Sequence, residues 1–122
     1  MIGYITLGTN KYEEAAAFYD ALLGDIGASR MMEADNFIAW GVGPKSAALS
    51  IIKPADGNAA TVGNGVMVAI GMDSTDKVDA FHAKALELGG TDEGAPGQRG
   101  EGFYAAYFRD LDGNKLNTFC LT

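Results

Sequence analysis

The sequence predicts an α+β fold built from two tandem βαβββ modules, and two observations carry that prediction. Each half of the chain begins with an alternating strand pattern, continues with helical spacing and then breaks into three short strand patterns. The halves also match when one is shifted along the other, which places Tyr4 on Met67, Phe18 on Phe81 and Leu23 on Leu86. Such an internal repeat indicates a duplicated module. We expect the 122 residues, 1–122, to form a single domain.

The first module is expected over about residues 1–53. Its first strand covers 2–8, and its helix begins at Asn10 and Glu13, a pair with the spacing of a capping box. Apolar side chains then recur at helical spacing until Gly24 ends the helix. Three short strands follow, at about 28–34, 36–41 and 47–53.

The second module is expected over about residues 65–122, after a loop of Gly, Pro and small polar residues at 54–64. Its strand covers 65–72, and Asp73 opens a helix that ends at a pair of glycines, Gly89 and Gly90. Its last three strands are expected at about 91–95, 103–110 and 114–121. Side by side, the two modules form one curved, mostly antiparallel sheet with the helices on its outer face.

Composition narrows the possible partners. The net charge of −7 disfavours nucleic acid, because phosphate binding needs a basic face, although it is compatible with a cationic ligand. No apolar stretch approaches the ~20 residues that span a bilayer. Met1 leads directly into a strand pattern rather than into a secretory leader. We therefore expect a cytoplasmic protein with no nucleic-acid or membrane partner.

The cysteine and histidine content excludes several kinds of site. One Cys and one His are too few for a zinc finger or for another site that needs several thiolates or imidazoles. Cys120 lies in an apolar strand pattern, which favours a buried, inert thiol. His82 lies in the apolar stripe of the second helix, which favours a core or interface histidine over a ligand or base.

The segment 108–116, FRDLDGNKL, has the residues of a tight hairpin turn. Together with the runs Ala17-Phe18-Tyr19 and Asp79-Ala80-Phe81-His82, it resembles the glyoxalase, bleomycin resistance protein and extradiol dioxygenase superfamily, also called the vicinal oxygen chelate superfamily. The resemblance covers nearly the whole chain. It implies a homodimer and, in the metal-dependent members, a divalent metal ion on the concave face of the sheet.

Carried over residue by residue, the family's metal-ligand positions fall on Tyr4, approximately Ser50, Met67 and Asn117. A divalent zinc, nickel or iron ion prefers imidazole nitrogens and charged oxygens. A phenol, a hydroxyl, a thioether and an amide supply neither. We therefore predict no metal and no other cofactor at these positions.

The concave face is still expected to form a pocket for a small organic molecule. By strand alternation its lining is Tyr4, Thr6, Ser50, Met67, Ala69 and Asn117. An apolar surface with a few polar groups is typical of a small-molecule site. The glycine-rich segment 94–102 is expected to form a mobile rim, and Phe37 and Trp40 either line the pocket or pack under the first helix.

Three functions stay open at this point. The first is metal-free binding of a small organic molecule in the concave pocket. The second is a metal-dependent lyase or isomerase of the lactoylglutathione lyase type, against which the missing ligands argue. The third is a non-catalytic interaction module or pseudo-enzyme, in which the surface alone matters. A closed-up former site, filled by Tyr4 and Met67, is a separate alternative to the expected pocket.

Overall fold

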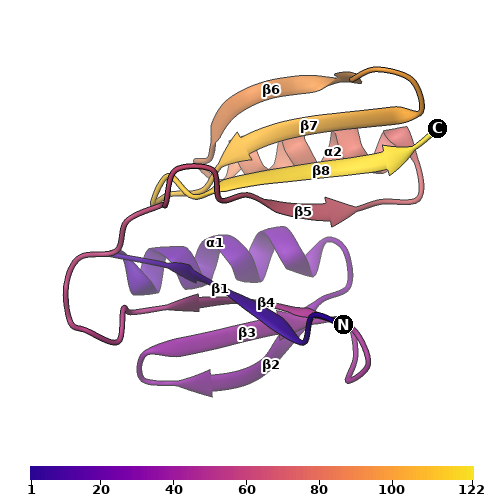
Figure 1. Cartoon of the computed structure of the whole chain (residues 1–122). Helices are drawn as coiled ribbons and strands as arrows, with labels where there is room; N and C mark the ends of the chain where they lie inside the picture. Colours follow the sequence, from indigo (N-terminus) through magenta and orange to yellow (C-terminus); the bar gives the residue numbers. More distant parts are fainter. The chain divides into compact units, whose positions relative to one another are not determined.

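The computed structural model describes residues 1–122 and divides them into two compact units, Met1–Val62 and Gly63–Thr122. Each unit is one βαβββ module, so the predicted α+β fold with a duplicated module is confirmed. The expected single sheet takes the form of two four-stranded mixed sheets, one in each module. In each module the helix covers one face of the sheet (Figure 1).

The first module contains a parallel strand pair at one side of its sheet and antiparallel pairs elsewhere. Strand order is β1-β4-β3-β2, with β1 parallel to β4. The elements are β1 (Tyr4–Gly8), α1 (Tyr12–Gly24), β2 (Ser29–Ala34), β3 (Phe37–Gly41) and β4 (Ala48–Ile52).

The second module repeats this topology with longer final strands. Its order is β5-β8-β7-β6, with β5 parallel to β8. The elements are β5 (Val68–Gly71), α2 (Thr75–Glu87), β6 (Thr91–Gln98), β7 (Phe103–Arg109) and β8 (Lys115–Leu121). The same order in both modules is what a duplication predicts.

The start of α1 differs from the sequence prediction. Lys11 is the N-cap and its side chain makes no capping hydrogen bond, so the cap lies one residue later than the predicted cap at Asn10. The Asn10 amide instead accepts a hydrogen bond from the backbone nitrogen of Ala60 at 2.7 Å and donates one to its carbonyl at 3.1 Å. Gly8 permits this approach, since a β-carbon on Gly8 would lie 2.8 Å from that of Ala60. The segment 54–62 is thus held to the first module.

Asn10→Ala is therefore expected to destabilise the first module by about 1–2 kcal/mol, because two hydrogen bonds to the backbone of Ala60 are lost. Urea unfolding measures this loss, and faster proteolysis between residues 54 and 62 is expected with it. Asn58→Ala is the matched control, since Asn58 donates a hydrogen bond to Asp56 from its backbone nitrogen and not from its side-chain amide. Equal effects of the two substitutions would contradict the role given to Asn10.

The predicted end of α2 at Gly89 and Gly90 is confirmed, but the N-cap lies one residue later than the predicted start at Asp73. Ser74 is the N-cap, and its hydroxyl accepts a hydrogen bond from the Lys77 nitrogen at 3.3 Å. At the other end Gly89 has φ of +104°, a backbone conformation that favours glycine. A β-carbon on Gly90 would lie 2.8 Å from the Ala85 carbonyl oxygen, so a larger residue has no room there.

The core of the first module lies between α1 and its sheet. Trp40 is 1% exposed, and its ring centroid lies 5.6 Å from that of Tyr19 on α1. Its indole nitrogen donates to Asp20 at 2.8 Å, and Asp20 also receives two hydrogen bonds from Arg30. The Arg30 hydrogen bonds hold the pKa of Asp20 below its usual range. Trp40 therefore packs under the helix, which settles one of the alternatives left open by the sequence.

The predicted DLDGN turn between β7 and β8 is held by hydrogen bonds to one carboxylate. Asp110, which is buried, accepts hydrogen bonds from the backbone nitrogens of Asp112 and Asn114, both at 2.9 Å. Its second oxygen accepts from the Asn114 amide at 3.0 Å. Gly113 has φ of +89°, so glycine suits the turn on conformational grounds as well.

Candidate functional site

In each module one face of the sheet is covered by the helix, and the strand register identifies the side chains of the other face, here called the open face. Trp40 contacts α1, so its strand partner Leu49 also lies on the helix face. The next positions, Ala39 and Ser50, are paired with each other and point to the open face.

The same reasoning applies to the second module. Phe108 packs against Phe81 on α2 and is paired with Leu116, which places both on the helix face. Asn117, the next residue along β8, therefore lies on the open face, opposite Tyr107.

Ser50 and Asn117 occupy matching positions in the two modules. Ser50 is paired with Thr6 on β1, and Asn117 is paired with Ala69, the residue of β5 that the repeat aligns with Thr6. Ser50 is therefore the residue of β4 that corresponds to Asn117 of β8. Both side chains are almost fully buried, at 0% and 1% exposed.

Each of these two residues has a polar atom without a hydrogen-bond partner. They are the Ser50 hydroxyl and the Asn117 side-chain carbonyl. The amide nitrogen of Asn117 donates to the Ala106 carbonyl at 3.3 Å, which orients the side-chain carbonyl away from that strand. A buried polar atom left unpaired costs about 1–3 kcal/mol, so each is a position where a ligand's polar group would be stabilised.

Thr118 also has an unpartnered hydroxyl, but its position is different. It is paired with Ala106, which packs against Val78 of α2. The hydroxyl therefore lies on the helix face, within the core, and does not mark a place for a ligand.

The two remaining predicted positions are exposed. Tyr4 is 62% exposed and its ring meets that of Phe37 edge-on, with centroids 6.1 Å apart. Met67 is 41% exposed and precedes β5 by one residue. The convergence of Tyr4, Ser50, Met67 and Asn117 on one ligand stays a prediction.

The side chains at these four positions do not fit a divalent metal ion. In the first module they are a phenol and a hydroxyl, and in the second a thioether and an amide, with no imidazole and no charged oxygen among them. Within each module, no three His, Cys, Asp or Glu side chains come close enough together to hold an ion. We therefore derive no chemistry through a metal.

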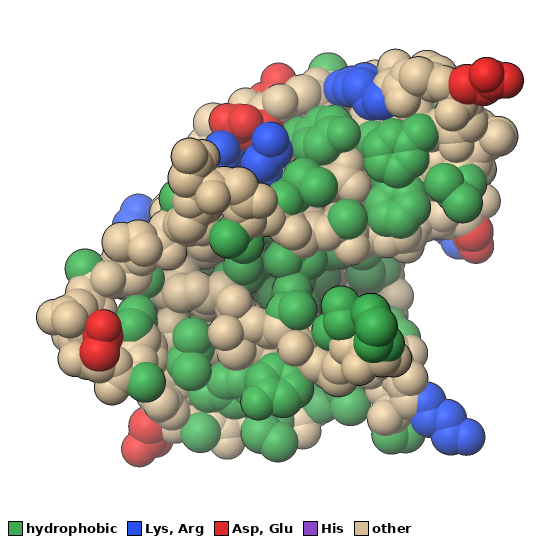
Figure 2. All heavy atoms as spheres, in the orientation of Figure 1, with side chains coloured by type: hydrophobic (Ala, Val, Ile, Leu, Met, Phe, Trp, Pro, Cys, Tyr) green, Lys and Arg blue, Asp and Glu red, His purple; other side chains and the backbone are tan.

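Aromatic side chains make most of the open face of the second module. The rings of Phe103 and Phe119 are stacked, with centroids 5.3 Å apart and planes at 26°. Tyr107 lies on the same face, because it alternates with Ala106 and Phe108 on β7. Figure 2 shows hydrophobic side chains gathered over β7 and β8, with Lys or Arg side chains at their border.

Two cations contact the Tyr107 ring. The guanidinium carbon of Arg99 lies 5.6 Å from the ring centroid, and the Lys115 amine lies 5.4 Å from it. Sequence reasoning missed these three residues. Alternation from Asn117 along β8 would have indicated Lys115, but the contact of Arg99 with Tyr107 crosses a bulged strand pair that no local pattern indicates.

More of the glycine-rich segment forms a strand than the sequence predicts. Thr91–Gln98 form β6, which pairs with β7 through two register shifts, so much of the expected rim is a strand. Only residues 99–102 form the connecting turn, where Gly100 and Gly102 have positive φ. The strand prediction of 91–95 was therefore too short.

The predicted burial of the single histidine and the single cysteine is confirmed. His82 is buried on the helix face, where its Nε2 lies 3.1 Å from Asp92 and 3.2 Å from the Tyr107 carbonyl. Cys120 is buried and packs with Val78 and Ala106. Neither side chain lies on the open face.

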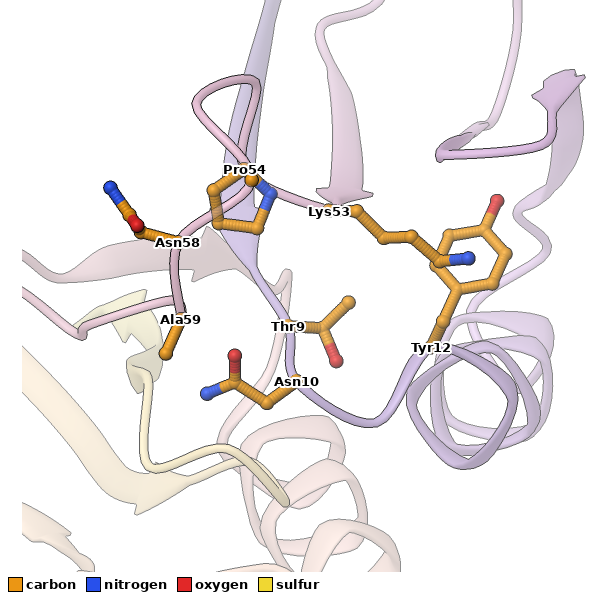
Figure 3. A pocket seen from close by; sticks show the side chains of 8 residues that line it. Thr9, Asn10, Tyr12, Lys53, Pro54, Asn58 and Ala59 are labelled. Atoms are coloured by element: carbon orange, nitrogen blue, oxygen red, sulfur yellow. The ribbon is translucent and has the colours of Figure 1, made fainter.

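The first module also has a hollow where the 54–62 segment passes the turn between β1 and α1 (Figure 3). Its volume is about 360 Å³. The lining residues are Thr9, Asn10, Tyr12, Lys53, Pro54, Gly57, Asn58 and Ala59. Two of its polar side chains are already engaged, since Lys53 lies 4.8 Å from the Tyr12 ring centroid and Asn10 binds Ala60. The hollow is therefore better explained by the packing of the 54–62 segment than by the binding of a ligand.

Comparison with known proteins agrees with this architecture. The profile of the Glyoxalase/Bleomycin resistance protein/Dioxygenase superfamily matches residues 1–118. A crystal structure of a glyoxalase/bleomycin resistance protein from Albidiferax ferrireducens T118 is 34% identical, with a TM-score of 0.88 and coverage of 100% of this chain and 99% of that one. The chain therefore belongs to the glyoxalase/bleomycin resistance protein/dioxygenase superfamily.

Two further structures are more distant. A hypothetical protein from S. aureus is 25% identical, with a TM-score of 0.77 and coverage of 98% of this chain and 92% of that chain. A lactoylglutathione lyase from Agrobacterium tumefaciens is 18% identical, with a TM-score of 0.73 and the same coverage, and at that identity it shows the fold alone. No curated protein matches the chain. Neither helix has the length and apolar composition needed to cross a bilayer.

Proposed function

We propose that the protein binds a small organic molecule on the open faces of its sheets, without a divalent metal. The observation that carries this proposal is the matching pair of buried polar atoms on Ser50 and Asn117, which have no hydrogen-bond partner. An aromatic surface with a few convergent polar groups is the usual composition of a small-molecule site. Tyr4 and Met67 are proposed to complete the lining.

The chemistry of Asn117 supports binding of a hydrogen-bond donor. Its side-chain carbonyl is an acceptor, so a ligand hydroxyl or N–H group would satisfy it. An apolar residue of similar size would fill the same space without leaving a polar atom unpaired. Asn at this position therefore lowers the stability of the fold unless a ligand donates to its carbonyl.

The alternatives fit these residues less well. A metal-dependent lyase or isomerase needs a Lewis acid to stabilise an enediolate, and the four family positions supply no competent ligands for one. An interaction module does not require unpaired buried acceptors on the open face. Homodimer formation and a cytoplasmic location stay predictions, and light scattering of the purified protein tests the first of them.

Asn117→Leu is expected to change the free energy of unfolding by no more than about 1 kcal/mol, because removal of an unpaired buried carbonyl offsets loss of the hydrogen bond to the Ala106 carbonyl. The same substitution is expected to abolish retention of a copurified small molecule, measured by native mass spectrometry of the protein as isolated. Ligand retention would then be lost with little change in stability.

Thr118→Val is the matched control, because it removes an unpartnered hydroxyl from the helix face of the same strand. It is also expected to change the free energy of unfolding by no more than about 1 kcal/mol and to leave ligand retention intact. Loss of retention in both variants, or in neither, would contradict the assignment of Asn117 to the site.

Introducing metal ligands tests whether the family positions converge. Tyr4→His, Met67→His and Asn117→Glu together are expected to create nickel or zinc binding, because imidazole and carboxylate replace weak donors. Isothermal titration of the triple variant and the wild type measures the gain. No gain in affinity would mean that these three positions do not meet on one ligand.

A further inference from the structure

The second module's open face carries two cations that no carboxylate neutralises. Arg99 and Lys115 both lie against the Tyr107 ring, and neither takes part in an ion pair. The other cation on this side, Arg109, is paired with Glu93 at 3.2 Å. Two neighbouring cations without a carboxylate partner are not expected from the composition of a protein whose net charge is −7.

The position of Arg99 depends on two glycines of β6. A β-carbon on Gly97 would lie 2.9 Å from one terminal nitrogen of Arg99, and one on Gly94 would lie 3.3 Å from the other. Neither glycine has a positive φ, so their backbone does not require glycine. Their lack of a side chain leaves space for the guanidinium, which also donates to the Ala95 carbonyl. Gly94 and Gly97 of β6 thus leave room for the Arg99 guanidinium beside the Tyr107 ring.

The unpartnered carbonyl of Asn117 lies on the same face as this cation pair. Tyr107 is the strand partner of Asn117, and Lys115 is two residues before Asn117 on β8. Side chains two residues apart on a strand point to the same face. An acceptor, an aromatic ring and two cations are therefore neighbours within one module.

We propose that this face recognises a small organic anion, one with a planar apolar body, a carboxylate and a hydroxyl or N–H donor. The carboxylate binds Arg99 and Lys115, the planar body lies on the Tyr107, Phe103 and Phe119 rings, and the donor reaches the Asn117 carbonyl. This inference rests on the proposed function and names its ligand class. The local charge of this face favours an anionic ligand, although the net charge of −7 is compatible with a cationic one.

Three probes of matched shape test the charge preference: indole-3-acetate, indole-3-acetamide and tryptamine. They share an aromatic N–H donor and differ in carrying a negative charge, no charge or a positive charge. Titration at millimolar concentration, followed by NMR of the Asn117 side-chain amide, is expected to show the tightest binding for the acetate and the weakest for tryptamine.

Variants then assign the preference to particular residues. Lys115→Gln and Arg99→Gln are each expected to weaken acetate binding about threefold to tenfold and to leave acetamide binding unchanged. Gly97→Ala is expected to act in the same direction, because its methyl group displaces the Arg99 guanidinium while the backbone is retained. Lys77→Gln is the control, since it removes the same charge from α2.

The outcomes separate the two proposals. Equal binding of the acetate and the acetamide, or no effect of either glutamine variant on the difference between them, would overturn the anion preference and leave small-molecule binding intact. If none of the three probes shifts the Asn117 amide, both proposals fail.

Discussion

Trp40→Ala is expected to lower the free energy of unfolding by about 3–5 kcal/mol, the usual cost of truncating a fully buried indole. The ring is 1% exposed, packs on Tyr19 and donates to Asp20, so the substitution leaves a cavity and removes one hydrogen bond. Because domains have only about 5–15 kcal/mol of stability, this is a large part of the total. Urea unfolding followed by far-ultraviolet circular dichroism measures it, since Trp40 is the one tryptophan in the chain.

Trp40→Phe separates packing from the hydrogen bond. It keeps an aromatic ring beneath α1 and removes the donor to Asp20, so a loss of about 1–2 kcal/mol is expected. A similar small loss in Trp40→Ala would contradict the position of Trp40 in the core and would favour its alternative place on the ligand face.

Asp110→Ala is expected to destabilise the second module by about 2–4 kcal/mol. The carboxylate receives three hydrogen bonds from the DLDGN turn, and hydrogen bonds to charged groups contribute about 1.5–3 kcal/mol each, less when they act together. The turn sets the register of β7 against β8, so the position of Asn117 depends on it. Ligand retention is therefore expected to fall together with stability.

Asp56→Ala is the matched control for this prediction. Asp56 also caps a turn with its carboxylate, accepting from the Asn58 nitrogen at 2.9 Å, but in an exposed loop. Its removal is expected to cost less than about 0.5 kcal/mol. Comparable losses in the two variants would mean that burial adds nothing to the Asp110 network.

The fold was predictable because its signals are local and repeated. Helical spacing ending at Gly89–Gly90, alternation along the strands and the DLDGN turn each specify one element. The match of Phe18 with Phe81 then indicated the duplication, without information about contacts in the folded protein. Each of these signals concerns residues close in sequence, where propensity and periodicity act.

The errors arose where a distant contact decides the structure. Asn10 has the spacing of a capping box, but its amide binds Ala60, 50 residues away. The segment from Gly94 to Gln98 has the composition of a loop, yet pairing with β7 makes it a strand. Long-range pairing of this kind outweighs weak local propensity.

The candidate site was predictable only in part for the same reason. The turn motif anchored Asn117, and strand alternation placed it on the face away from the helix. Sequence could not settle the register of Ser50, which depends on pairing with Thr6 and Ala39. Nor could it indicate that Arg99 folds back over Gly94 and Gly97 to reach Tyr107.

The most direct test of metal-free ligand binding is a crystal structure of the protein as isolated, without chelator, with anomalous data at the metal absorption edges. We expect density for an organic molecule hydrogen-bonded to the Asn117 carbonyl, and no metal ion within bonding distance of Tyr4, Ser50, Met67 or Asn117. An ordered metal ion coordinated by these side chains would contradict it.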